Sequence, residues 1–186
     1  MAYASLRDFL ARLEQSGRLV RVREPVSTVL EMTEIQTRLL ADGGPAVIFE
    51  NAIKADGTRS EMPVLVNLFG TVERVAWGME REPQDLRALG ETLAFLRQPE
   101  PPSGLREAWD MLPLVKQAMA MRPATRRGSA PCQEVVLTGD AIDLNRLPIQ
   151  TCWPNEPAPL ITWPLVVTKG PGETAEDSFN LGIYRM

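Results

Sequence analysis

The segment near the end of the chain, Asn180-Leu181-Gly182-Ile183-Tyr184-Arg185, combines residue types that could do chemistry. An asparagine amide oxygen is a hard donor of the kind that Mn2+ and Mg2+ prefer. An arginine guanidinium stays charged and can hold a carboxylate through two parallel hydrogen bonds. Each also has a simpler interpretation, because a strand-entry asparagine often satisfies local backbone and a strand-end arginine often forms a surface ion pair. At this point both interpretations of Asn180 and Arg185 stay open.

The spacing of these residues raises a geometric question. In a regular strand, side chains alternate between the two faces, so Asn180, Gly182 and Tyr184 point one way and Leu181, Ile183 and Arg185 the other. For Asn180 and Arg185 to serve one site, the chain must twist or bulge between them, or a ligand must straddle the strand. We therefore expect a local irregularity near Gly182.

The composition of the 186 residues excludes several classes of site. There is no histidine, which excludes His-based triads and imidazole metal sites within the chain. The net charge of −4 gives no basic surplus, so we expect no nucleic-acid partner. Two cysteines, Cys132 and Cys152, are too few for a disulfide framework, and we interpret both as structural residues of a reduced, cytoplasmic protein. The first residues do not read as a signal peptide, and no apolar run approaches the ~18 residues of a membrane span.

Apolar residues at helical and strand spacing predict the elements that must position the candidate residues. The predicted helices cover residues 4–16, 31–41, 71–79, 84–97 and 104–121, the last of them interrupted near Pro113. The predicted strands of the first part cover residues 19–22, 46–49 and 63–67, the third being the return strand of a hairpin. Glycine and proline clusters such as Gly43-Gly44-Pro45 separate these elements.

The same patterns predict two domains and a linker. Residues 1–122 indicate an α/β (α+β) N-terminal domain, and the basic, Pro- and Gly-containing residues 123–131 indicate a linker. Residues 132–186 indicate the start of a β-rich domain, with strands expected at 134–137, 160–168 and 179–186. So few strands would leave sheet edges unpaired, and the chain stops inside a strand. We therefore expect a truncated part of a longer protein.

Motifs along nearly the whole chain carry a resemblance to a known family. They are Leu6-Arg7-Asp8-Phe9-Leu10, Gly43-Gly44-Pro45-Ala46, Asn67-Leu68-Phe69-Gly70-Thr71, Pro99-Glu100-Pro101-Pro102, Ala130-Pro131-Cys132-Gln133, Asp143-Leu144-Asn145-Arg146-Leu147-Pro148-Ile149, Thr151-Cys152-Trp153-Pro154, Leu160-Ile161-Thr162-Trp163 and Asn180 to Arg185. In this order they resemble the UbiD family of prenylated-FMN-dependent decarboxylases, and within it the bacterial enzymes that act on 3-polyprenyl-4-hydroxybenzoate in ubiquinone biosynthesis.

The resemblance implies a fold and an activity. The fold would be an α/β N-terminal domain followed by the first strands of a β-rich split-barrel flavin-binding domain. The activity would be the non-oxidative decarboxylation of a small aromatic acid, with prenylated FMN, a divalent metal (usually Mn2+) and often K+ as cofactors. The full-length protein would be a homo-oligomer, by family a hexamer, with cofactor supplied by a flavin prenyltransferase. The polyprenyl group of the substrate suggests peripheral contact with the inner face of the membrane.

The resemblance also implies roles for residues. Asn180 would be a metal ligand, and Arg185, as the catalytic residue, would face the substrate carboxylate and the flavin. Gly182, Ile183, Tyr184 and Thr162 would contact the cofactor. The family's metal-binding glutamate and proton-donating acids lie beyond residue 186, so we expect the 186-residue chain alone to be inactive. Pro164 departs from the pattern, since we expect glycine there in close relatives.

Three alternatives stay open. The chain could be a non-catalytic interaction or assembly module, which the coding sequence after Met186 would decide. It could belong to a decarboxylase of another aromatic or α,β-unsaturated acid. An ordinary FMN-binding split-barrel reductase would fit the β-rich end but leaves the motifs before residue 130 unexplained.

Overall fold

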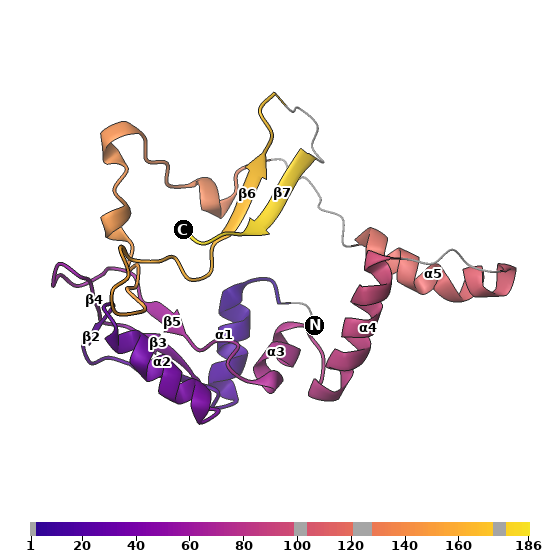
Figure 1. Ribbon diagram of the computed structural model, residues 1–186, viewed down its shortest axis with the longest axis horizontal. Helices are drawn as coiled ribbons and strands as arrows, with labels where there is room; N and C mark the ends of the chain where they lie inside the picture. Colours follow the sequence, from indigo (N-terminus) through magenta and orange to yellow (C-terminus); the bar gives the residue numbers. More distant parts are fainter. Residues whose placement is uncertain (1–2, 99–103, 121–127, 173–177) are drawn as a thin grey trace. The chain divides into compact units, whose positions relative to one another are not determined.

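A computed structural model describes residues 3–98, 104–120, 128–172 and 178–186 of the chain (Figure 1). The chain divides into two compact units. The first unit combines Met1–Glu80 with Leu137–Met186, and the second comprises Arg81–Val136. The predicted division into residues 1–122, 123–131 and 132–186 stays a prediction, and residues 121–127 of that linker region lie outside the described ranges.

Helices and short strands alternate in the first eighty residues, which confirms the mixed α/β character predicted for this part. The helices are α1 (Leu6–Gln15), α2 (Glu31–Ala41) and α3 (Val72–Gly78). The strands are β1 (Leu19–Val22), β2 (Val26–Ser27), β3 (Ala46–Phe49), β4 (Ala52–Ile53) and β5 (Val64–Val66). One sheet has the order β1-β3-β5, with β1 parallel and β5 antiparallel to β3, and β2 pairs with β4 in a separate parallel ladder.

The central strand β3 is buried on both faces, which explains its uninterrupted apolar sequence. Val47 and Phe49 pack in one cluster with Met32 of α2, and the alternate residues Ala46 and Ile48 pack in another cluster that contains Phe9 and Leu13 of α1. The sheet therefore separates two small cores, one under each helix. Burying a side chain such as that of Phe49 contributes about 1.5–3 kcal/mol.

Glycines end the two helices as the sequence predicts. Gly17 and Gly43 follow α1 and α2 with φ values of 67° and 62°, a left-handed conformation that favours glycine. At the other end of α1, the Ser5 backbone N–H donates to the Asp8 carboxylate at 3.0 Å. After each stop the chain enters a strand, and these two strands, β1 and β3, pair in parallel with Leu19 opposite Ala46.

The second unit is helical. It contains a 3-10 turn (Pro83–Asp85), α4 (Leu86–Arg97), α5 (Leu105–Ala120) and a second 3-10 turn (Pro131–Gln133). The predicted interruption near Pro113 is wrong, because α5 runs through that proline. The strand predicted at 134–137 is also wrong: these residues form no strand, and Val135 and Val136 are exposed.

The remaining part of the first unit contains two 3-10 turns (Gly139–Ala141 and Leu144–Arg146) and an antiparallel pair, β6 (Leu165–Lys169) and β7 (Phe179–Ile183). This pair confirms two of the three strands expected after residue 132. Two bridges tie the segment before β6 together and to the N-terminal part, Gln150 with Leu160 and Val29 with Thr151. None of the described helices combines the length and the apolar character that crossing a membrane would need.

Candidate active site

The candidate residues 180–185 lie on and just beyond β7. The ladder with β6 is in continuous register, from Lys169 opposite Phe179 to Leu165 opposite Ile183, and Val166 lies opposite Gly182. The predicted irregularity near Gly182 is therefore wrong. Beyond the strand, the Tyr184 N–H still donates to the Pro164 carbonyl at 3.3 Å.

One face of β7 carries Asn180, Gly182 and Tyr184, as alternation requires. The Asn180 Nδ2 donates to the Tyr184 hydroxyl at 3.4 Å. A Cβ at Gly182 would lie 2.5 Å from Tyr184 Cε2, so the glycine admits the tyrosine ring against the strand. The Asn180 amide oxygen has no hydrogen-bond partner among the described residues, which leaves a hard donor open to solvent.

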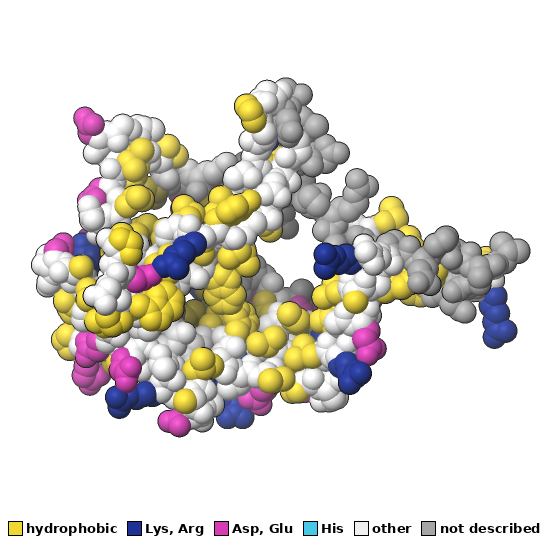
Figure 2. Space-filling model, viewed as in Figure 1, with side chains coloured by type: hydrophobic (Ala, Val, Ile, Leu, Met, Phe, Trp, Pro, Cys, Tyr) yellow, Lys and Arg dark blue, Asp and Glu magenta, His cyan; other side chains and the backbone are white. Residues whose placement is uncertain are grey.

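The opposite face of the β6–β7 pair is exposed and mostly apolar, and its charged member is Lys169, whose Nζ lies 4.7 Å from the Phe179 ring centroid. The hydrophobic members are between 58% and 69% exposed, and hydrophobic side chains reach the surface around β6 in Figure 2. They are Leu165, Val167, Phe179, Leu181 and Ile183. Arg185 lies two positions beyond Ile183 and so continues this face. Asn180 and Arg185 therefore do not share a face.

Arg185 forms an ion pair with a residue from a distant loop. Its guanidinium Nη2 contacts Oε1 of Glu156, and its side chain remains 68% exposed. The Glu156 side chain is only 9% exposed, and its second oxygen, Oε2, is buried without a partner among the described residues. No local pattern indicates a role for Glu156, because it lies in a Pro-rich loop without a repeating pattern.

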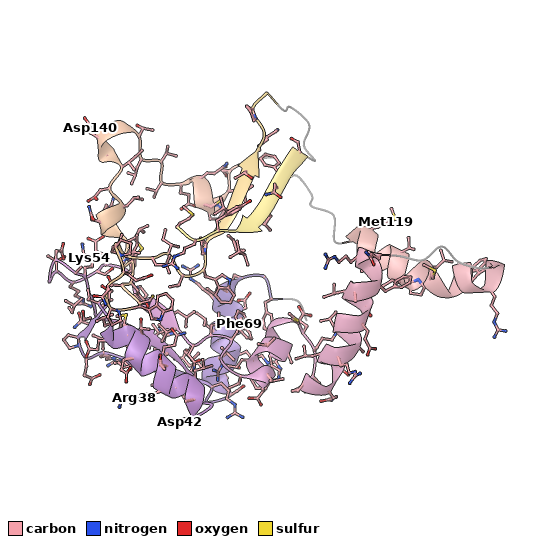
Figure 3. The ribbon with its side chains drawn as sticks, in the orientation of Figure 1. Arg38, Asp42, Lys54, Phe69, Met119 and Asp140 are labelled. Carbon is pink, nitrogen blue, oxygen red and sulfur yellow. The ribbon has the colours of Figure 1, made fainter. Side chains whose placement is uncertain are left out.

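Thr162 lies at a hollow of about 480 Å3 in the first unit. The hollow is lined by uncharged residues, including the three aromatic side chains of Phe69, Trp153 and Trp163. The rings of Phe69 and Trp163 meet edge to face, with centroids 5.2 Å apart, and Phe69 also stacks on Phe9 of α1 at 5.9 Å. Phe69, labelled in Figure 3, thus contacts both Phe9 of the N-terminal part and Trp163 of the segment that carries Thr162.

A buried arginine positions the loop 67–70 that carries Phe69. Arg74, in α3, is 1% exposed, and its guanidinium donates to the carbonyls of Gly44, Asn67 and Leu68 at 2.9–3.0 Å. Burial lowers the pKa of Arg74, the nearby positive charge of Arg18 lowers it further, and Glu73 partly opposes both effects. Sequence patterns missed this role, because an arginine in a short helix normally indicates an exposed position.

Asn67 completes the same cluster. It has a φ of 56°, and its Nδ2 donates to the carbonyls of Gly44 and Pro45 at 3.1 and 2.9 Å. A Cβ at Gly70 would lie 1.8 Å from the Asn67 Oδ1, so only glycine fits at that position. The motif Asn67-Leu68-Phe69-Gly70 is therefore structural at its two ends.

The described residues do not contain a complete metal site. No group of three or more Asp, Glu or Cys side chains gathers in a way that could hold an ion within the part of the chain that the structure describes. Asn180 offers one oxygen, which fits a divalent metal in donor chemistry but supplies a single ligand.

Comparison with known protein families identifies the family of the chain. Residues 10–93 match the 3-octaprenyl-4-hydroxybenzoate carboxy-lyase N-terminal domain, and residues 124–186 match the Rift-related domain of the same enzyme family. The chain belongs to the UbiD family. The two matches follow each other in the order that the sequence motifs predict.

Solved UbiD-class structures share the fold of the chain. An evolved dimeric form of HmfF from Pelotomaculum thermopropionicum, in complex with prFMN, is 25% identical with a TM-score of 0.66, covering 98% of this chain and 35% of that one. The open form of vanillic acid decarboxylase from Sedimentibacter hydroxybenzoicus is 26% identical with a TM-score of 0.69, covering 100% and 36%. This chain therefore spans about a third of the length of these UbiD-class enzymes.

Proposed function

We propose that the chain is the N-terminal part of a carboxy-lyase that releases CO2 from 3-polyprenyl-4-hydroxybenzoate with prenylated FMN and a divalent metal. The observation that carries the proposal is the match of two successive UbiD-family domains along residues 10–93 and 124–186. The prFMN complex of the similar enzyme HmfF supports the choice of flavin. Both matching domains are those of 3-octaprenyl-4-hydroxybenzoate carboxy-lyases, which supports 3-polyprenyl-4-hydroxybenzoate as the substrate class.

The residues of β7 fit this role in their chemistry. In the proposal, the Asn180 amide oxygen is one ligand of Mn2+, and the other ligands come from the two thirds of such an enzyme that this chain does not span. Arg185, largely exposed, holds the substrate carboxylate through its guanidinium. Bound prenylated FMN supplies an acceptor for the electron pair that the breaking C–CO2 bond leaves behind.

Other residues orient the parts of the site. Thr162 lies at the aromatic-lined hollow, and the ring of Tyr184 packs against Gly182. We propose that Thr162, Gly182, Ile183 and Tyr184 contact the cofactor, with Tyr184 moving off Gly182 when the flavin binds. The tyrosine is about half exposed, so the ring can move without disturbing the core.

The assembly belongs to the proposal as well. We propose a homo-oligomer, by family a hexamer, that takes its cofactor from a flavin prenyltransferase and binds K+ beside the divalent metal. The polyprenyl tail of the substrate would bring the enzyme to the inner membrane surface. In the proposed assembly, the exposed apolar side chains of the β6–β7 pair are covered by another part of the protein.

The test is an assay of substrate range. The complete reading frame that contains these residues is coexpressed with a flavin prenyltransferase, purified with Mn2+, and tested for CO2 release. The proposal predicts release from 3-polyprenyl-4-hydroxybenzoate in preference to vanillate, and no release by residues 1–186 alone. Preference for vanillate would change the substrate class, and no release from any aromatic or α,β-unsaturated acid would favour the non-catalytic module.

A further inference from the structure

The ion pair between Glu156 and Arg185 is asymmetric, and this asymmetry carries an inference beyond the family match. The Glu156 side chain is 9% exposed, whereas that of Arg185 is 68% exposed. The acid is therefore fixed by its surroundings, and the guanidinium reaches outward from it. An ordinary surface ion pair, such as Arg38 with Glu34 in α2, has both members exposed.

The loop that carries Glu156 is held at several points. The Gln150–Leu160 bridge closes it, with the Leu160 N–H donating to the Gln150 carbonyl at 2.8 Å. At the base of the loop, the Thr151 N–H donates to the Thr28 carbonyl at 3.1 Å. The loop that carries Glu156 is therefore attached to the N-terminal part of the unit through Thr28.

Hydrogen bonds also hold the backbone on both sides of Arg185. Among the described residues, the Arg185 side chain itself forms a polar contact with Glu156 alone. The Tyr184 N–H donates to the Pro164 carbonyl at 3.3 Å, and the Met186 carbonyl accepts from the Ile161 N–H at 2.8 Å. An exposed arginine side chain otherwise samples many rotamers, so the contact with Glu156 selects one direction for the guanidinium.

The contact leaves the arginine able to bind a second anion. It joins Nη2 of Arg185 to Oε1 of Glu156, and the guanidinium has further N–H groups on Nε and Nη1. Oε2 of Glu156 accepts no hydrogen bond from the described residues. Among those residues, Arg185 is therefore the cation that pairs with this carboxylate. A planar guanidinium held on one side by a buried carboxylate can offer its free edge to another carboxylate.

We infer that Glu156 is a positioning residue that holds the Arg185 guanidinium ready for the carboxylate of an aromatic acid substrate. The inference rests on the proposed function, in which Arg185 binds that carboxylate. Glu156 itself does not touch the substrate. Its effect is to remove the cost of ordering a long side chain when the substrate binds.

The experiment uses the 186-residue chain and two readouts. The first is the side-chain Nε–Hε signal of Arg185 in 1H–15N spectra, assigned by its loss in Arg185→Lys. The second is the affinity for 4-hydroxybenzoate, measured by NMR titration with phenol as the ligand that lacks the carboxylate. The variants are Glu156→Ala, the isosteric Glu156→Gln, and Glu34→Ala as the control from an exposed ion pair.

In Glu156→Ala, the Arg185 Nε–Hε signal should move toward that of a free arginine and exchange faster with water. The affinity for 4-hydroxybenzoate should fall about five- to tenfold, the cost of ordering one long side chain. Glu156→Gln keeps an acceptor oxygen at the same place and should lose about twofold or less. Glu34→Ala should change neither readout, and unchanged backbone amide signals will show that each variant is folded.

The outcomes separate this inference from the proposed function. Unchanged or tighter binding by Glu156→Ala, while the unaltered chain binds 4-hydroxybenzoate, overturns the positioning role and leaves the proposed function standing. If the unaltered chain binds 4-hydroxybenzoate no better than phenol, the carboxylate-binding role of Arg185 fails. The Nε–Hε signal then still decides whether Glu156 orients Arg185, because an unchanged signal in Glu156→Ala overturns that too.

Discussion

Replacing Arg74 with methionine should destabilise the first unit, because the Arg74 guanidinium donates hydrogen bonds to three backbone carbonyls. No other described side chain donates to all three. The three hydrogen bonds join Arg74 to Gly44, Asn67 and Leu68. After the substitution, the Gly44 carbonyl keeps its bond from Asn67 Nδ2, and the Asn67 carbonyl keeps one from the Gly70 N–H. The Leu68 carbonyl loses its donor among the described residues.

These contacts set the size of the effect. A buried carbonyl without a donor costs about 1–3 kcal/mol, and the two weakened bonds add to this loss. The methionine side chain offsets part of it, because burying a guanidinium is costly and a thioether is not. We therefore expect Arg74→Met to lower the free energy of unfolding by about 2–4 kcal/mol. Arg74→Lys keeps the charge but not the planar fork, and should lose about half as much.

The assay is urea unfolding followed by circular dichroism at 222 nm. Arg38→Met is the matched control, because Arg38 is an exposed helical arginine with a single ion-pair partner, and it should change the free energy by less than about 0.5 kcal/mol. If Arg74→Met unfolds within about 0.5 kcal/mol of the unaltered chain, Arg74 does not hold the loop. The same loss in both variants would show a general effect of removing positive charge.

Three further outcomes follow from single contacts. Gly70→Ala should destabilise the chain by about 2–4 kcal/mol in urea unfolding, because a Cβ would lie 1.8 Å from the Asn67 Oδ1. Gly90→Ala, which has open space around it in α4, should instead stabilise the chain by about 0.5–1 kcal/mol. An equal effect of the two substitutions would contradict the packing at Gly70. Gly182→Ala should push the Tyr184 ring off β7 and abolish the NMR contacts between Asn180 and Tyr184. Because the tyrosine ring is half exposed, the substitution should cost less than about 1 kcal/mol of stability. Retained contacts between Asn180 and Tyr184 would refute this prediction. The hydrogen bonds from the Thr58 hydroxyl and N–H lower the pKa of Asp56, so its contribution to stability is complete above the ordinary value of 3.8 and is lost as the pH falls through the lower value of the folded chain. An NMR titration of Asp56 should therefore have its midpoint below 3.8, and a midpoint at or above 3.8 would contradict the contact.

Local signals predicted the N-terminal elements well. The helix over 31–41 and the strands over 19–22 and 46–49 have the predicted bounds, because glycine stops and periodic apolar residues act within each segment. The two-residue strands β2 and β4 were missed, since so short a ladder depends on long-range pairing and has no period to read. Residues 134–137, a glutamate followed by three apolar residues, satisfied the strand pattern but form no strand in the structure.

The roles of the candidate site residues stay predictions, whereas their contacts in the structure can be compared with what the sequence indicated. Alternation correctly placed Asn180 and Tyr184 on one face of β7, where they form a hydrogen bond. The expected bulge at Gly182 was wrong, because the glycine admits the Tyr184 ring instead of bending the strand. Glu156 and Arg185 are 29 positions apart, and their contact depends on loop positions that no local pattern specifies.

We propose that Asn180 and Arg185 bring a UbiD-class site its metal ligand and its carboxylate-binding cation. The most direct measurement compares metal content, bound prenylated FMN and CO2 release in Asn180→Ala, Arg185→Met and the control Arg38→Met of the complete reading frame. We expect Asn180→Ala to lose Mn2+, Arg185→Met to keep Mn2+ but release CO2 at least about a hundredfold more slowly, and the control to match the unaltered enzyme. Full metal content in Asn180→Ala together with unchanged turnover in Arg185→Met would contradict it.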